Sequence, residues 1–140
     1  MKYKVVMKDE RESGLREVLN LGHTVGRAIE TVSDYKLLHG EAVSIGLVAQ
    51  AKLGEKYGYI SPENVCRVIK LCERAKLPVA IPDYIDKAAL VRKLYTDKKV
   101  RDGKLRMVFQ KEIGDVMCFG DNDYAKQITE PEIAEVIDEM

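Results

Sequence analysis

Apolar residues recur every three or four positions along most of the chain, and this spacing is typical of amphipathic helices. Two helical pieces are predicted first, over Leu15–Asn20 and Thr24–Val32, with a bend at Gly22 between them. The segment Glu41–Tyr57 is apolar on nearly all sides, which indicates a helix buried at the centre of the fold.

Helix boundaries are also visible in the second half of the chain. Ser61 followed by Pro62 predicts a helix start, because serine caps the free amide groups and proline fits the first turn. This helix carries apolar residues at Val65, Val68, Ile69, Leu71 and Cys72 and should end before Leu77-Pro78. A shorter amphipathic helix is expected next, with apolar residues from Ile85 to Leu94 and an end near Asp97-Lys98-Lys99.

One segment departs from the helical spacing. Leu105, Met107 and Phe109 alternate with polar residues, and further apolar residues follow Gly114, so a β-hairpin is expected near residues 104–118. A capping motif over 129–132 then predicts a last helix, Ile133–Met140. The expected fold is therefore mainly α, a multi-helix bundle with one small β-hairpin.

The composition describes an ordinary globular protein. A length of 140 residues predicts a single domain, 1–140, with room for a proper core. The sequence has no apolar run of about 18 residues and no signal peptide, so we expect a cytoplasmic protein that does not enter membranes. Basic and acidic residues balance at 23 each, which argues against nucleic-acid binding by the whole domain.

Three cysteines add little chemistry to this picture. Cys66, Cys72 and Cys118 are odd in number and have no CxxC spacing, which argues against a disulfide framework and a cysteine zinc site. We expect reduced thiols, most of them buried.

The candidate chemistry begins with the two histidines of the chain. His23 and His39 each stand beside a glycine at a predicted helix border, and 15 residues separate them, enough for a helix and a return loop that brings the rings together. Imidazole is the commonest zinc ligand, but catalytic zinc needs a third protein ligand. The spacing alone therefore supports either part of a metal site or two hydrogen-bonded histidines at helix ends.

Charged residues surround His23 in the sequence. Arg27 and Glu30 follow it on the same helix face. Arg16 and Asn20, also four apart, could form a fork for a phosphate or a carboxylate. The alternative for this second pair is a solvated helix surface.

Longer motifs now extend these observations, and together they closely resemble the 3-dehydroquinate synthase family. They run from Lys2-x-x-Val5-Val6 to Ile113-Gly114 and include Asp9-Glu10-x-Glu12, Gly14-Leu15-Arg16, Leu19-Asn20-Leu21-Gly22-His23-Thr24, Ala28-Ile29-Glu30, His39-Gly40-Glu41-Ala42-Val43, Asp97-Lys98-Lys99 and Gly103-Lys104-Leu105. The resemblance spans almost the whole chain and covers the C-terminal helical domain of the family. The glycine-rich turn of a nucleotide-binding domain does not occur in this sequence.

The resemblance implies an activity, cofactors and partners. Enzymes of this family convert a seven-carbon 2-keto sugar-acid phosphate, 3-deoxy-arabino-heptulosonate 7-phosphate, to 3-dehydroquinate with release of phosphate, in the shikimate route to aromatic amino acids. It implies zinc, or another divalent metal such as cobalt, and NAD bound mainly by an N-terminal domain that lies outside this sequence. It also implies a homodimer in the full-length form, and little or no turnover by these residues alone.

The resemblance also assigns roles to individual residues. It makes His23 and His39 two of three zinc ligands, the third being a glutamate of the other domain. Substrate-binding positions match at Lys2, Glu12, Arg16, Asn20 and Arg27, and catalytic positions at Arg27 and at one of Lys98 or Lys99.

The chain departs from the family pattern at one site position. Most of the family reads Gly-His-Thr-x-Gly-His, and Arg27 stands here in place of the second histidine, which lies near the substrate phosphate. Arginine keeps the positive charge and can hold a phosphate, but it cannot shuttle protons near neutral pH. We expect a working but altered site.

Three functions remain open at this point. The first is the zinc- and substrate-binding part of a 3-dehydroquinate synthase. The second is a related sugar-phosphate cyclase or a metal-dependent polyol dehydrogenase, although a small polyol would not require the cations and amide between Lys2 and Asn20. The third is a non-catalytic module that binds a metal or another protein.

Overall fold

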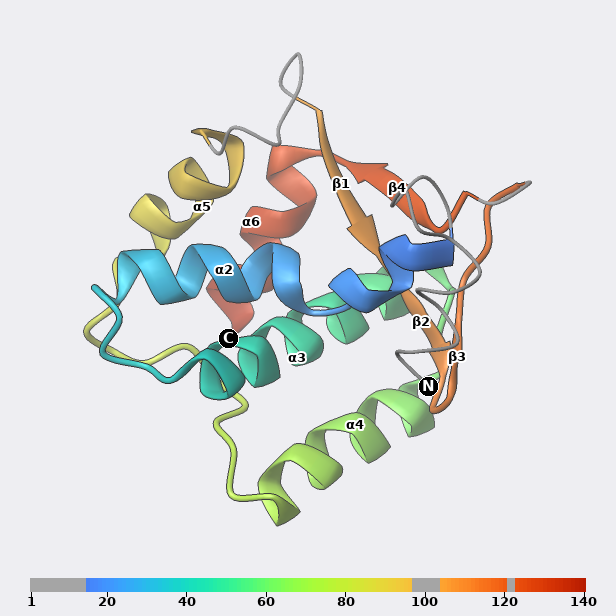
Figure 1. The fold of residues 1–140 in the computed structure, drawn as a ribbon, viewed down its shortest axis with the longest axis horizontal. Helices are drawn as coiled ribbons and strands as arrows, with labels where there is room; N and C mark the ends of the chain where they lie inside the picture. The colour runs from blue at the N-terminus through green and yellow to red at the C-terminus, as the bar shows by residue number, and fades with distance from the viewer. Residues whose placement is uncertain (1–14, 97–103, 121–122) are drawn as a thin grey trace.

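A computed structural model describes residues 15–96, 104–120 and 123–140. Its elements in chain order are a short 3-10 helix, η1 (Leu15–Asn20), and the helices and strands α2 (His23–Val32), α3 (His39–Tyr57), α4 (Pro62–Arg74), α5 (Lys87–Thr96), β1 (Leu105–Val108), β2 (Gln110–Glu112), β3 (Asp115–Val116), β4 (Ala125–Ile128) and α6 (Glu130–Glu139) (Figure 1). The mainly α fold predicted from the sequence is confirmed.

The central element is α3, the helix that the sequence shows as apolar on nearly all sides. In Figure 1 it lies between α2 and α4, and it also contacts α6 and β2. Ile45, Val48, Ala49 and Ala51 are completely buried along it. Burial on all sides removes apolar surface from water along the whole helix, so α3 organises the core.

The predicted bend at Gly22 is confirmed as the junction between η1 and α2. Gly22 adopts a left-handed conformation, φ 77°, which a residue with a side chain rarely takes. The amide of Gly26 donates to the Gly22 carbonyl at 3.0 Å, and this bond closes the first turn of α2. The chain therefore changes direction at Gly22 and begins a new helix with His23.

Capping residues set several other helix ends. The hydroxyl of Ser61 accepts a hydrogen bond from the amide of Asn64 at 3.2 Å, as the Ser61-Pro62 signal predicts. At the start of α3 the Glu41 carboxylate accepts the amide of Leu38 at 2.9 Å, and Glu132 accepts the amide of Thr129 at 3.2 Å before α6. These bonds satisfy amide groups that a helix leaves unpaired.

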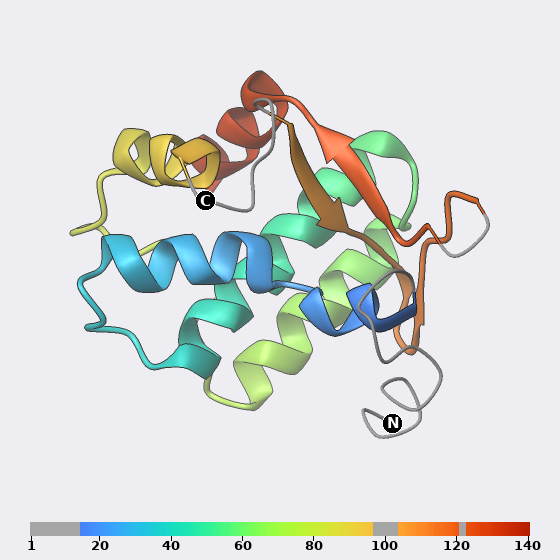
Figure 2. The same ribbon diagram turned by 45° about the horizontal axis from the view of Figure 1, so that its top comes forward.

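Two small antiparallel sheets follow the helices. The pair β2–β3 forms a hairpin that turns at Gly114, within the range predicted for one. The strand β1 instead pairs with β4, with Leu105 opposite Ile128 and Val108 opposite Ala125. The sequence did not predict this pairing, because it joins two short strands that the β2–β3 hairpin separates along the chain. Figure 2 shows β1 and β4 side by side at the end of the molecule opposite the α2–α3 loop.

Two details of the expected burial are wrong. Cys72 is buried with Val65 and Val68 on one face of α4, but Cys66 and Cys118 are exposed. The expectation that most of the thiols are buried is therefore wrong. Leu71, another apolar residue of the predicted helix, is 57% exposed. The α4 face toward α3 is narrower than the apolar pattern indicates, because α4 packs on only one side.

No helix among the described residues is long and apolar enough to cross a membrane.

Candidate functional site

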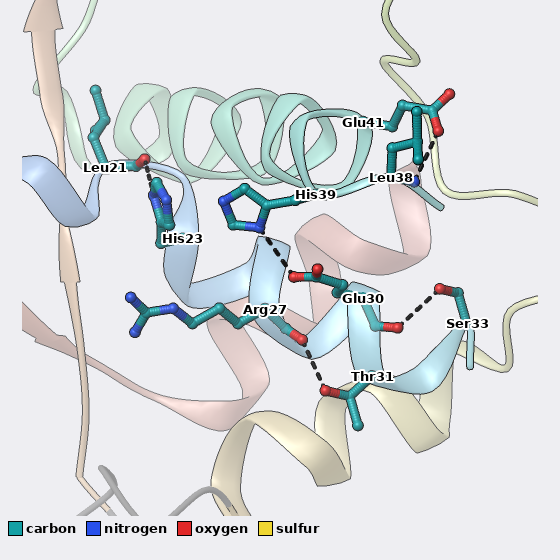
Figure 3. A network of polar contacts seen from close by, with 9 residues as sticks. All are labelled: Leu21, His23, Arg27, Glu30, Thr31, Ser33, Leu38, His39 and Glu41. Carbon is teal, nitrogen blue, oxygen red and sulfur yellow. Dashed lines mark hydrogen bonds and ion pairs between the residues drawn. The ribbon is translucent and has the colours of Figure 1, made fainter. Parts of the chain in front are cut away.

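The two histidines meet at the point where α2 and α3 begin. His23 is the first residue of α2 and His39 is the first residue of α3. Their ring centroids are 5.3 Å apart and the rings are tilted by 54° (Figure 3). The approach expected from the sequence spacing is therefore present in the structure.

Glycines determine how closely these two helices approach. A Cβ atom added at Gly46 would lie 2.0 Å from the carbonyl oxygen of Gly22 and 2.8 Å from the amide nitrogen of Gly26. A Cβ at Gly26 would lie 3.0 Å from the Cα of Val43. The two backbones thus touch directly, and this contact places the first residues of both helices side by side.

Each imidazole uses its Nδ1 atom in a hydrogen bond within the protein. His23 Nδ1 lies 3.1 Å from the carbonyl oxygen of Leu21, and His39 Nδ1 lies 3.1 Å from the Oε2 atom of Glu30. A carbonyl or an ionised carboxylate only accepts, so Nδ1 carries the proton in both rings. An imidazole with its proton on Nδ1 presents the Nε2 lone pair when it is neutral, which is the state in which histidine binds a metal ion.

Arg27 and Glu30 lie one turn apart on α2 and point differently. The Glu30 side chain is 20% exposed and is directed at His39, whereas the Arg27 side chain is exposed and its guanidinium points away from Glu30 (Figure 3). The cation next to the histidines is thus available to an anionic ligand. An arginine fork can hold a phosphate or a carboxylate through two parallel hydrogen bonds.

The remaining predicted site residues are only partly covered by the structure. Asn20 is the half-buried last residue of η1, directly before the turn into α2. Arg16 also lies in η1, but its side chain is outside the described part of the chain. Lys2, Glu12, Lys98 and Lys99 all fall outside the described residues.

A complete metal site is not formed by the residues that the structure describes. In those ranges no group of three histidine, cysteine, aspartate or glutamate side chains could hold a metal ion. Two imidazole nitrogens are nevertheless donors that suit Zn²⁺ or Co²⁺. The donor set therefore fits part of a metal site, with the other ligands to come from elsewhere.

Sequence reasoning missed two contacts that shape this arrangement, those of Glu30 and Gly46. It grouped Glu30 with His23 on one face of a helix, whereas the carboxylate contacts His39 across the helix pair. Gly46 gave no signal beyond a glycine inside a helical run, and its contact with α2 is visible only once the two helices are docked.

Comparison with known proteins identifies the family. Residues 1–100 match the family model described as 3-dehydroquinate synthase C-terminal. The chain is 45% identical over 115 residues to the 3-dehydroquinate synthase of Thermodesulfovibrio yellowstonii, covering 81% of this chain and 32% of the relative. The enzyme of the same name from Aliivibrio fischeri is 43% identical over 140 residues, covering 99% of this chain and 37% of the relative.

Solved structures show the same fold. A 2-deoxy-scyllo-inosose synthase complexed with carbaglucose-6-phosphate, NAD⁺ and Co²⁺ superposes with a TM-score of 0.88 at 24% identity, over 99% of this chain and 39% of that one. A 2-epi-5-epi-valiolone synthase from Streptomyces hygroscopicus with NAD⁺ and Zn²⁺ bound gives 0.76 at 25% identity, over 96% and 35%. This chain spans about a third of the length of the relatives it matches.

The family match and the curated relatives agree on the same part of the same enzyme family. The chain belongs to the 3-dehydroquinate synthase family and corresponds to its C-terminal part.

Proposed function

We propose that residues 1–140 act as one helical domain that supplies the metal- and substrate-binding part of a 3-dehydroquinate synthase active site. The reaction is the conversion of 3-deoxy-arabino-heptulosonate 7-phosphate to 3-dehydroquinate with release of phosphate. The observation that carries the proposal is the histidine pair, whose rings lie 5.3 Å apart and whose Nδ1 atoms are both hydrogen-bonded within the protein.

His23 and His39 would hold the metal ion through their Nε2 atoms. The third ligand, a glutamate, would come from the rest of the longer protein, in keeping with relatives about three times the length of this chain. Zinc or cobalt is the proposed ion, in line with the Zn²⁺ and Co²⁺ named for the two solved structures. When bound, such an ion polarises a substrate hydroxyl and lowers its pKa.

Cationic and amide side chains of this chain would bind the substrate. Arg27 is exposed beside the histidines and suits the phosphate, and Arg16, Lys2 and one of Lys98 or Lys99 would add positive charge for the phosphate and the carboxylate. The Asn20 amide and the Glu12 carboxylate would bind hydroxyl groups. Arg27 cannot shuttle a proton near neutral pH, so the proton that accompanies phosphate elimination would go to another group or to the phosphate itself.

The nicotinamide cofactor belongs to the other part of the active site. The sequence has no glycine-rich turn of the kind that seats a pyrophosphate, so NAD would be bound mainly by the N-terminal domain. Full-length assembly as a homodimer and a cytoplasmic location also remain proposals. We expect these 140 residues alone to perform no turnover, since the sequence has no such seat and the described residues form no group of three metal-ligand side chains.

A related sugar-phosphate cyclase is the second candidate function. The observation that favours it is the structural likeness to two cyclases with other products, together with the arginine in place of a family histidine. The curated 3-dehydroquinate synthases are closer in sequence, at 43% to 45% identity against 24% to 25%. A polyol dehydrogenase is less well supported still, because an uncharged substrate would have no use for the Arg27 cation.

Metal binding tests the first half of the proposal. We expect the 140-residue chain to bind Co²⁺, followed by its visible absorption, and His39→Ala to weaken binding by at least about 100-fold, more than the loss of an outer hydrogen-bond partner. Gly40→Ala is the matched control, because a Cβ there meets open space and leaves both imidazoles in place. Equal Co²⁺ affinity of His39→Ala and the parent chain would contradict the ligand assignment.

Reconstitution tests the reaction itself. The chain would be mixed with the N-terminal domain of a curated relative, NAD and a divalent metal, and inorganic phosphate release from the keto-acid substrate would be measured. Release that requires both parts supports the proposal. No release from this substrate, with release from a sugar 6-phosphate instead, would favour the second candidate.

A further inference from the structure

The two histidines of the site are held by different kinds of partner. His23 donates to a backbone carbonyl, that of Leu21, two residues earlier on the same chain segment. His39 donates to the side chain of Glu30, which belongs to the neighbouring helix α2. The first contact is fixed by the backbone turn at Gly22, whereas the second depends on one side chain.

His39 depends strongly on this contact because little else surrounds it. Its side chain is 58% exposed, and the neighbouring Gly40 leaves open space beside it. An exposed imidazole turns freely about its side-chain bonds, and in water it favours the proton on Nε2. Rotation would turn the Nε2 lone pair of His39 away from the metal position beside His23, and a proton on Nε2 would occupy that lone pair.

The Glu30 carboxylate is well placed to prevent both changes. It is four-fifths covered, lies 3.1 Å from Nδ1, and points to His39 rather than to Arg27 (Figure 3). The acceptor fixes the proton on Nδ1 and the orientation of the ring together. Because α2 and α3 touch through Gly26 and Gly46, the two ends of the contact cannot drift apart.

We propose that Glu30 is a positioning residue that holds His39 in the Nδ1–H tautomer, with Nε2 directed to the metal position beside His23. This inference rests on the proposed function for its purpose, since the tautomer matters only if His39 binds a metal ion. Loss of such an outer partner typically costs about 10-fold to 100-fold in metal affinity.

The tautomer can be measured directly on the metal-free chain. Two-bond ¹H–¹⁵N correlation spectra at about pH 8.5, where an imidazole is ordinarily neutral, report which ring nitrogen carries the proton. The chain has two histidines, so each gives a separate pattern. We expect the Nδ1–H pattern for both in the parent chain, and in Glu30→Ala a change to predominant Nε2–H for His39 alone.

His23 serves as the internal control, because its acceptor is a backbone carbonyl that no side-chain substitution removes. An unchanged His23 pattern shows that the fold around the α2–α3 junction is intact. Glu73→Ala, on the exposed side of α4, controls for the loss of one negative charge and should leave both patterns unchanged. A His39 pattern that stays Nδ1–H in Glu30→Ala overturns the inference.

A Co²⁺ titration then tests the consequence for metal binding. Glu30→Ala should weaken Co²⁺ binding by about 10-fold or more, and Glu73→Ala should not. Affinity within about 2-fold of the parent chain overturns the positioning role. These outcomes are separate from the proposed function, which fails if the reconstituted pair releases no phosphate even though the His39 tautomer responds to Glu30→Ala.

Discussion

The two ends of α3 are held to the rest of the protein in opposite ways. Its first half lies against α2 through glycines, with backbone touching backbone at Gly22, Gly26 and Gly46. Its last residue, Tyr57, joins a cluster of large side chains with Tyr59, Phe109 and Lys126. The histidines lie at the first end and the aromatic cluster at the second.

The aromatic end is a network of side chains with several partners each. Ring centroids of Tyr57, Tyr59 and Phe109 lie 5.3 to 5.7 Å apart. The Lys126 ammonium lies 4.4 Å from the centre of the Tyr57 ring and donates to the Tyr59 hydroxyl at 2.5 Å. The Tyr57 hydroxyl donates to the Glu132 carboxylate.

The difference predicts how each end responds to substitution. A backbone contact has no flexible part, so an added atom must push two helices apart. In a network of side chains, shortening one member removes its own interaction, about 1 kcal/mol for a hydrogen bond, and adds no atom that the neighbours must accommodate. The site end should therefore tolerate no added atom at the contacting glycines, Gly22, Gly26 and Gly46, and the aromatic end should lose stability in small steps.

The largest effect is expected for Gly46→Ala. The new Cβ would lie 2.0 Å from a backbone oxygen, which neither a rotamer change nor a small side-chain shift can relieve. We expect a loss of about 3 kcal/mol or more in the free energy of unfolding, at the upper end of overpacking costs. Urea unfolding followed by circular dichroism measures it.

Gly40→Ala is the control for the same chemical change in the same helix. Nothing lies within 4 Å of a Cβ at this position, and alanine is a better helix former than glycine. The free energy of unfolding should stay equal or rise by up to about 1 kcal/mol. If Gly46→Ala unfolds at the same urea concentration as Gly40→Ala, the backbone contact does not determine the packing of α2 on α3.

A smaller effect is expected for Tyr57→Phe at the other end of α3. The change removes the hydrogen bond to Glu132 and leaves the ring in the cluster, so we expect a loss of about 1 kcal/mol at neutral pH. Tyr35→Phe removes a hydroxyl from a side chain that is 68% exposed and should change the free energy of unfolding by far less.

The same variant should alter the pH dependence of stability. The hydrogen bond from Tyr57 is the main cause that lowers the pKa of Glu132 below its ordinary value of 4.5. A lowered pKa means that the unfolded chain takes up the proton first, so this contribution is present above about pH 4.5 and is lost as the pH falls through the folded pKa. The free-energy difference between Tyr57→Phe and the parent chain should therefore shrink in acid. A difference that is constant with pH would exclude this coupling.

The helices could be predicted from the sequence because their signals are local. Ser61 and Pro62 cap α4 within the segment that they begin, and the apolar pattern from Glu41 to Tyr57 is continuous. The β1–β4 pair could not be predicted, since it joins segments whose pairing depends on how the chain folds between them. Local rules thus predict elements, and tertiary packing decides which strands meet.

The candidate site shows the same division. Motif resemblance predicts His23 and His39, and their positions at helix starts follow from Gly22 and from the α3 cap at Glu41. The distance between the rings and the contact from Glu30 to His39 depend on the docking of α2 on α3. The docking requires that residue 46 has no Cβ atom, as in Gly46. A single glycine inside a helical segment does not reveal this requirement in the sequence.

The smallest effect is expected for Lys126→Met. Methionine keeps an unbranched apolar chain over the rings of Tyr57 and Tyr59 and removes the ammonium together with its hydrogen bond to the Tyr59 hydroxyl. Because this ammonium is only partly buried, the loss in the free energy of unfolding should be about 0.5 to 1 kcal/mol. The attraction of Lys126 is the weakest of the influences on the Glu132 pKa. Most of this loss should consequently persist in acid, unlike the loss in Tyr57→Phe. Urea unfolding of both variants in a series from neutral pH to well below pH 4.5 separates the two interactions. If the loss of stability in Lys126→Met disappears in acid together with that in Tyr57→Phe, the lysine acts through Glu132 and not through the rings. The aromatic end would then be one coupled unit and not a set of separable contacts.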